Sequence, residues 1–166
     1  MGDRRENFQI LRALSPTYAG QNGELTATLQ YVYQSVLLDG CGRGSEAKKL
    51  LKIAVDEMRH LETIGGLLVK LGVPPVFTAW PPYPVAYYSA SNVNYCRKYT
   101  EMLDADIRGE KDAIACYTRI LGTVRDDGVR EAIEKIRADE ERHLSILKEM
   151  RAAAGDSPQP PQGSRA

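Results

Sequence analysis

The chain has 166 residues, 43% of them hydrophobic and 27% charged, a composition typical of a globular domain with one well-buried core. Its 22 lysines and arginines equal its 22 aspartates and glutamates, so no net field favours nucleic acid or a membrane surface as a partner. The N-terminus leads into no apolar signal region and no stretch is apolar for long enough to span a bilayer, so we expect a cytoplasmic protein.

The apolar residues recur with helical periodicity along most of the chain, which predicts an all-α protein. A short lead-in helix is expected over residues 4–13. The first long helix is expected from Thr17, because Ser15-Pro16 is a helix-start signal. Capping residues, glycines and prolines then bound the four long helices, which we predict over residues 17–40, 45–71, 91–122 and 126–150.

Residues 73–90 contain five prolines and cannot form a regular helix. We interpret them as a long crossover, because a connection between two parallel neighbouring helices must travel about one helix length. The last residues, 152–166, have no apolar period and predict a disordered tail. The sequence therefore predicts a four-helix bundle domain over residues 1–151, with a long crossover between its second and third helices.

Both histidines of the chain, His60 and His143, follow a glutamate by three residues. Residues three apart share one face of a helix, so Glu57 with His60, and Glu140 with His143, can each supply two ligands to a metal ion. Two such pairs, with one glutamate from each of the other two helices, make up the dinuclear carboxylate site of four-helix bundles. One buried histidine alone is more often a packed core residue, so it is the pairing that indicates a metal site.

Glu24 and Glu110 are the candidates for the two remaining glutamates. Each is followed seven residues later by a tyrosine, Tyr31 and Tyr117 respectively. The spacing to the next motif is also similar, with 33 residues from Glu24 to Glu57 and 30 from Glu110 to Glu140. Two helical hairpins related by an approximate two-fold axis would place four carboxylates and two imidazoles around one point.

These motifs make the chain similar to the ferritin-like superfamily, and most closely to bacterioferritin-like proteins. The resemblance covers roughly residues 17–150 and depends on one motif in each long helix, at residues 23–31, 55–60, 102–110 and 137–143. It implies that Glu57 and Glu140 bridge two metals, with Glu24 and Glu110 as terminal carboxylates. His60 and His143 would each complete one ion, and Tyr31 would stand beside the centre as a catalytic residue.

The resemblance also has implications for haem and for assembly. Met58 falls where bacterioferritins place the methionine that binds haem across a two-fold subunit interface. Methionine at a helix interface is more often a packing residue, so haem is the less favoured reading of Met58. A ferritin cage subunit carries a short fifth helix near its C-terminus, but here that place is taken by the tail rich in proline, glutamine and glycine. We therefore expect a homodimer rather than a 24-subunit cage.

Carboxylate and imidazole ligands suit iron or manganese better than copper or structural zinc. The leading hypothesis is a di-iron site that oxidises iron(II) with O2 or H2O2. Residues 60–65 are also similar to manganese catalases, so a di-manganese site that dismutates peroxide is the alternative. A bundle that only binds metal is a third reading, whereas rubrerythrin is disfavoured because the chain has no Cys-x-x-Cys module.

Overall fold

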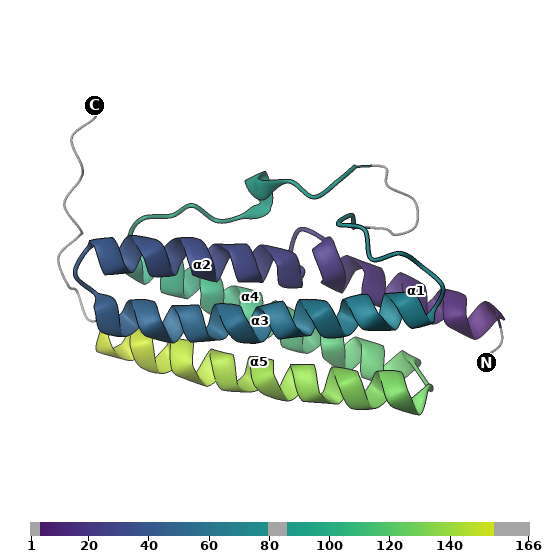
Figure 1. Cartoon of the computed structure of the whole chain (residues 1–166). Helices are drawn as coiled ribbons and strands as arrows, with labels where there is room; N and C mark the ends of the chain where they lie inside the picture. Colours follow the sequence, from purple (N-terminus) through teal and green to yellow (C-terminus); the bar gives the residue numbers. More distant parts are fainter. Residues whose placement is uncertain (1–3, 80–85, 155–166) are drawn as a thin grey trace.

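The computed structural model describes residues 4–79 and 86–154 (Figure 1). Within these residues the chain forms α-helices and one short 3-10 turn, and no strand, which confirms the predicted all-α fold. The elements in chain order are α1 (Arg4–Ala19), α2 (Glu24–Gly40), α3 (Gly44–Lys70), η1 (Ala90–Asn92), α4 (Tyr99–Thr123) and α5 (Asp127–Ala153). No described helix is both long and apolar enough to cross a membrane.

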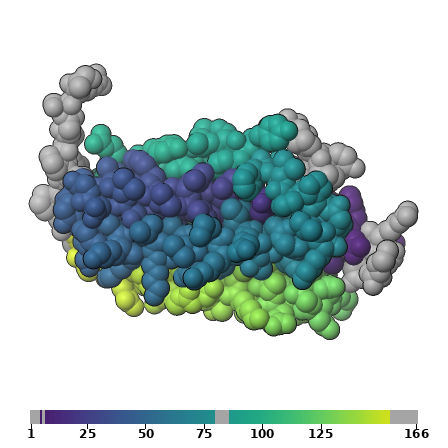
Figure 2. All heavy atoms as spheres, in the orientation of Figure 1, coloured from purple at the N-terminus to yellow at the C-terminus, as the bar shows by residue number. Residues whose placement is uncertain are grey.

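The four long helices form two hairpins. Helix α2 packs on α3 and α4 packs on α5, while α3 also contacts α5 (Figure 1). The connection between α3 and α4 returns along the length of the bundle beside α2, as the predicted crossover requires, and Figure 2 shows it covering that edge of the molecule. Residues 80–85 of this crossover, and residues 155–166 of the predicted tail, lie outside the described residues.

The predicted bounds of the first two helices are wrong. Helix α1 continues through Pro16 to Ala19, and α2 begins only at Glu24. Proline lacks the N–H that a helix interior needs, but the buried side chains of Leu14 and Tyr18 lie on either side of it. Their packing in the core outweighs the local helix-start signal.

The break between α1 and α2 is specified by two glycines. A Cβ atom on Gly20 would lie 2.3 Å from the Pro16 carbonyl oxygen, and one on Gly23 would lie 2.7 Å from the Thr17 carbonyl oxygen. The Thr26 hydroxyl donates to the Gly20 carbonyl at 3.1 Å and fixes the turn from the other side. This close backbone approach is possible only without side chains, and it places Glu24 at the first residue of α2.

The start of α4 also differs from the prediction. Residues 90–92, where the helix was expected to begin, form the 3-10 turn, and α4 starts at Tyr99. The intervening segment is held along α2 instead, because the Asn94 backbone N–H donates to Gln30 Oε1 at 2.9 Å and the Tyr33 hydroxyl donates to the Tyr95 carbonyl at 3.2 Å. These contacts with α2 replace the first turns of the expected helix.

Two apolar clusters fill the bundle. One, which includes Leu14, Ile64 and Ile133, joins α1 to the end of α3 and the start of α5. The other, which includes Leu50 and Leu147, joins the start of α3 to the end of α5. Buried polar residues separate the two clusters, and these residues form the site described next.

Candidate metal centre

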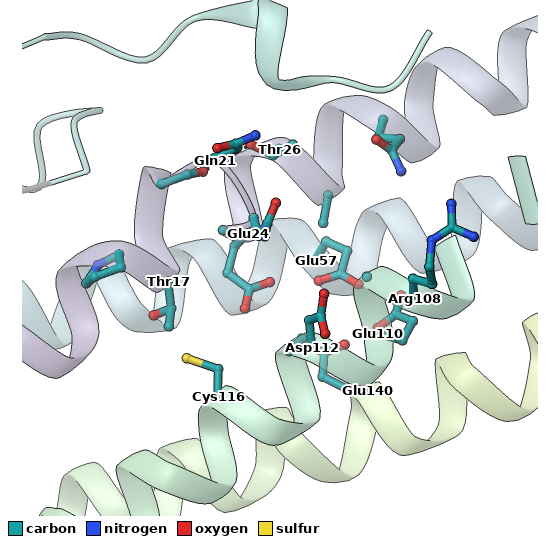
Figure 3. Close-up of a pocket in the computed structure, with 18 of the residues that line it drawn as sticks. Thr17, Gln21, Glu24, Thr26, Glu57, Arg108, Glu110, Asp112, Cys116 and Glu140 are labelled. Atoms are coloured by element: carbon teal, nitrogen blue, oxygen red, sulfur yellow. Dashed lines mark hydrogen bonds between the residues drawn. The ribbon is translucent and has the colours of Figure 1, made fainter. Parts of the chain in front are cut away.

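The six predicted ligand side chains lie together in the middle of the bundle, and each is at most 4% exposed. Their donor atoms form two groups, and within each group the atoms lie within 4.8 Å of one another. The first group is Glu24, Glu57, His60 and Glu140, and the second is Glu57, Glu110, Glu140 and His143. Glu57 and Glu140 belong to both groups, so the two groups share a pair of carboxylates (Figure 3).

Each histidine turns its Nδ1 atom toward the shared carboxylates. His60 Nδ1 lies 3.2 Å from Glu57 Oε2 and 3.3 Å from Glu140 Oε1, and it also lies 3.5 Å from Glu24 Oε2. His143 Nδ1 lies 3.1 Å from Glu57 Oε1 and 3.0 Å from Glu140 Oε2. The two rings are 5.8 Å apart between centroids, which places one imidazole in each group.

The four glutamates are buried without lysine or arginine partners among the described residues, so their charges perturb one another. Burial, and then the charge of Glu57, raises the pKa of Glu24 well above its ordinary value. Burial and the charges of Glu57 and Glu140 do the same to the pKa of Glu110. Without a cation, protons must therefore partly neutralise the terminal carboxylates.

The histidines neutralise the shared carboxylates. Burial opposes ionisation of Glu57, but hydrogen bonds from His143 and His60 outweigh it and lower the pKa of Glu57 to about 2. Burial likewise opposes protonation of His143, yet hydrogen bonds to Glu140 and Glu57 raise its pKa to about 10. Two divalent cations could replace these protons and balance four carboxylates, so the charge and the oxygen and nitrogen donors fit a dinuclear iron or manganese site.

A tyrosine holds each terminal carboxylate from the opposite helix. The Tyr31 hydroxyl of α2 donates to Glu110 Oε1 on α4, and the Tyr117 hydroxyl of α4 donates to Glu24 Oε1 on α2. Both tyrosines are buried. Burial, followed by the charge of Glu110, raises the pKa of Tyr31 well above its ordinary value, so Tyr31 remains a phenol. The spacing from glutamate to tyrosine that repeats in the sequence therefore corresponds to two equivalent contacts, in which the tyrosine of each helix binds the glutamate of the other.

Two aspartates that the sequence interpretation missed contact the outer sides of the histidines. His60 Nε2 lies 3.2 Å from Asp139 Oδ2, and His143 Nε2 lies 3.5 Å from Asp56 Oδ2. Asp139 is hydrogen-bonded to His60, and a carboxylate in this position fixes the orientation of an imidazole and makes its other nitrogen a better ligand. The Asp56 contact is longer, and His143 Nε2 has no hydrogen-bond partner among the described residues. The signal was present in the sequence, because Asp-Glu-x-Arg-His occurs twice, at residues 56–60 and 139–143.

The arginines of the same repeat form ion pairs with the two aspartates. Arg142 lies 2.5 Å from Asp139 and 3.0 Å from Asp56, so it joins the two aspartates across α3 and α5. Arg59 adds a further ion pair to Asp56 at 3.0 Å. The histidines are thus backed by an ionic network between α3 and α5.

The opposite side of the site is open. A cavity of about 690 Å³ lies between α2 and α4, and all four ligand-type glutamates line it (Figure 3). Gln21, Asn22, Arg108 and Asp112 also line the cavity and are exposed, so it opens to solvent. Met58, the candidate haem ligand, is elsewhere, 54% exposed on the outer surface of α3.

Comparison with known proteins agrees with this architecture. The sequence profile of the ferritin-like domain family matches residues 19–154. The chain belongs to the ferritin-like family. A bacterioferritin from Brucella melitensis biotype 1 is 29% identical over 129 residues, which cover 75% of this chain and 73% of the relative.

Two solved structures show the same fold. A manganese catalase from Anabaena matches with a TM-score of 0.76 at 23% identity, covering all of this chain and 80% of that one. The bacterioferritin of Desulfovibrio desulfuricans, whose structure describes a diiron site, matches with a TM-score of 0.74 at 23% identity, covering all of this chain and 98% of that one. These comparisons confirm the predicted ferritin-like bundle.

Proposed function

We propose that this ferritin-like protein carries a dinuclear iron site that oxidises iron(II) with O2 or H2O2. The observation that carries the proposal is the pair of donor groups that share Glu57 and Glu140 in the buried centre of the bundle. The bacterioferritin relative, and the diiron site of the Desulfovibrio protein with the same fold, support iron as the metal.

In this proposal Glu57 and Glu140 would each hold both ions, because their donor atoms belong to both groups. Glu24 and His60 complete one site, and Glu110 and His143 complete the other, as the membership of the two donor groups supports. Four carboxylates balance two divalent ions, so the occupied site is neutral in its reduced form. The ionic network behind the histidines keeps their Nδ1 atoms aimed at the ions.

When bound, the iron pair supplies the electrons that reduce O2 or peroxide. The side chains of the protein then have three tasks. The cavity admits the small substrates, namely iron(II), O2 and H2O2. The ionic network supports the histidines from the other side. Tyr31 is placed to give up one electron when the site is short of reducing equivalents. Its phenolic proton then passes to Glu110, because the Tyr31 hydroxyl already donates a hydrogen bond to that carboxylate.

The proposal is tested by adding iron(II) to metal-free protein in air. We expect iron(II) oxidation faster than in buffer, with the absorbance of oxo-bridged iron(III) developing in step. His60→Ala removes one ligand and should abolish the excess rate, whereas Glu62→Ala, an exposed position two residues away on α3, should keep it. Oxidation at the buffer rate by the wild-type protein would refute the ferroxidase function.

A di-manganese catalase is the competing function, because the same oxygen and imidazole donors suit manganese. The manganese-loaded protein would then evolve O2 from peroxide with no added reductant, since the metal pair both oxidises and reduces peroxide in turn. Our proposal predicts that the manganese-loaded protein lacks sustained activity of this kind. Catalase activity with manganese, together with no excess iron oxidation, would reverse the assignment.

A further inference from the structure

The wall of the cavity contains a buried acid that the proposed chemistry does not yet use. Asp106 lies on α4 one helical turn before Glu110, is only 2% exposed, and lines the cavity. Residues four apart on a helix are neighbours on one face, so Asp106 stands beside the Glu110 end of the site. Gln30 and Gln34 face it from α2, on either side of Tyr31 in the sequence.

The two oxygens of Asp106 differ in their contacts. Oδ1 accepts a hydrogen bond from Gln30 Nε2 at 2.8 Å and another from Gln34 Nε2 at 2.9 Å. Oδ2 is buried and has no hydrogen-bond partner among the described residues. Leaving such an atom unpaired costs about 1 to 3 kcal/mol, so water from the cavity is its natural partner.

Among the described residues no lysine or arginine is hydrogen-bonded to Asp106, and the charge of the exposed Arg108 favours its ionised form less than the two glutamine hydrogen bonds do. On α2 it faces the neutral amides of Gln30 and Gln34 and the phenol of Tyr31, and on α4 its charged neighbours are Glu110 and the exposed Arg108. Among its described residues, the crossover approaches this group through the backbone N–H of Asn94, which donates to Gln30. Burial raises the pKa of Asp106 to about 6, against the hydrogen bonds from both glutamines. Both protonation states are therefore accessible near neutral pH.

The proposed reaction needs such a group. Reduction of one peroxide to two waters by two iron(II) ions consumes two protons, and oxidation of Tyr31 releases one. The cavity between α2 and α4 opens to solvent and is lined by both Tyr31 and Glu110, so it offers protons a path to this end of the site. We propose that Asp106 is the proton relay of this site, exchanging protons at Oδ2 between cavity water and the pair formed by Tyr31 and Glu110.

The relay balances without a further reagent. Cavity water protonates Oδ2, and the Asp106 carboxylic acid then passes its proton through a water molecule to Glu110. Glu110 gives the proton to a peroxide oxygen that leaves as water, and the Asp106 carboxylate is reprotonated from the cavity. Release of the Tyr31 proton follows the same steps in reverse. Asp106 is therefore a positioning and relay residue that acts through Glu110 and Tyr31. It does not contact the substrate or the shared carboxylates Glu57 and Glu140. This inference rests on the proposed function, but the titration of Asp106 can be measured on the metal-free protein.

The first test compares Asp106→Asn with Asp112→Asn, because Asp112 is an exposed carboxylate lining the same cavity. Asparagine is close to aspartate in shape but cannot exchange the proton. We expect Asp106→Asn to bind metal like the wild-type protein and to reduce peroxide with iron(II) at least about tenfold more slowly. The wild-type rate should fall as pH rises through about 6, whereas the Asp106→Asn rate should be flat.

Chemical rescue distinguishes a relay from a structural role. Imidazole or formate can enter a cavity of about 690 Å³ and should restore the rate of Asp106→Asn in proportion to its concentration, with no effect on Asp112→Asn. A wild-type pH profile in Asp106→Asn, or a slow rate that neither additive restores, would overturn the proposal.

The second test is made on metal-free protein and does not depend on the ferroxidase function. Infrared titration should show a carboxylic acid band with a midpoint near pH 6 that Asp106→Asn lacks. Gln34→Met removes one donor to the ionised form, so it should move this midpoint to higher pH while the carboxylate itself stays in place. If Asp106→Asn fails to fold, an unchanged midpoint in Gln34→Met refutes the relay by itself.

Discussion

Each buried carboxylate at the centre of this bundle is held by a residue from another helix. Tyr31 of α2 binds Glu110 of α4, Tyr117 of α4 binds Glu24 of α2, and the histidine Nδ1 atoms lie between the shared carboxylates. Removal of one partner leaves a buried polar atom unpaired, which costs more than the hydrogen bond itself contributes. A single substitution at these positions should therefore lower the free energy of unfolding, and its effect on the reaction rate can be measured separately.

Tyr31→Phe should leave metal binding intact and slow turnover, because the phenol supplies an electron and its proton moves to Glu110. We expect a loss of about 1 kcal/mol in unfolding free energy from the missing hydrogen bond. Tyr33→Phe is the control, since Tyr33 lies on the same helix but its hydroxyl binds the Tyr95 carbonyl at the surface. Stopped-flow kinetics identical in Tyr31→Phe and the wild-type protein would remove Tyr31 from the mechanism.

Asp139→Asn should weaken metal binding by roughly 10-fold to 100-fold, because the amide no longer orients His60 or raises the basicity of its Nδ1 atom. The measurement is a competition titration against a chelator of known affinity. Asp104→Asn is the matched control, since Asp104 pairs with Arg151 away from the site. Equal affinity in the two variants would show that Asp139 serves only the surface ion pairs.

At the scale of helices, the sequence predicted those features that depend only on residues within a single helix. The spacing of Glu57 to His60 and of Glu140 to His143 was sufficient because both residues of each pair lie on one face of one helix. The break at Gly20 and the extension of α1 through Pro16 were not predictable in this way, because packing of Leu14 and Tyr18 decides them. The cavity was missed for the same reason, since it depends on the separation of α2 and α4.

Gly20→Ala tests the break between α1 and α2. The new Cβ atom would lie 2.3 Å from the Pro16 carbonyl oxygen, so the backbone must move, at a cost of about 1 to 3 kcal/mol. Because Glu24 begins the helix that follows, metal affinity should fall as well. Both effects can be followed by chemical unfolding and by metal titration.

Gly66→Ala is the control for this substitution. Gly66 lies inside α3 and a Cβ atom there would meet nothing within 4 Å, so alanine should raise stability by about 0.5 to 1 kcal/mol and leave metal binding unchanged. If Gly20→Ala is equally harmless, the break is not held by the close approach of its backbone.

For the whole molecule, the buried centre couples metal binding to pH. The pKa of His143 is raised from 6.5 to about 10, so its stabilising effect is complete below the unfolded value and is lost as pH rises through the folded value. The raised pKa values of Glu24 and Glu110 act in the same direction, because ionisation of these buried acids opposes folding as pH rises.

The metal-free protein should therefore unfold at progressively lower temperature as pH rises from about 7 to about 10. Bound metal replaces the protons of the centre, so the metal-loaded protein should have a higher Tm and a flatter pH dependence. Calorimetry of both forms across this range is the measurement. A metal-free protein whose Tm rises with pH would contradict the proton balance described for the centre.

The outer surface of α2 and α3 carries exposed apolar side chains at helical spacing. We call it the outer apolar face, and it comprises Leu29, Val32, Val36, Leu51, Val55 and Met58. Contiguous exposed apolar surface of this kind marks an interaction site, and a second copy of the chain related by a two-fold axis would cover it with the same surface. Such an arrangement also brings the two Met58 residues toward the interface, where a haem held by both would lie.

Light scattering should thus return a dimer for the wild-type protein. Val36→Asp, at a position 70% exposed in the single chain, places a charge in the predicted interface and should give monomers that still bind metal. Phe8→Asp is the control, because Phe8 is also exposed but lies on α1, outside the outer apolar face. If the dimer binds added haem, Met58→Leu should abolish the spectrum of methionine-ligated haem and keep the dimer. A wild-type monomer, or a 24-subunit particle, would show that this face does not pair two subunits as predicted.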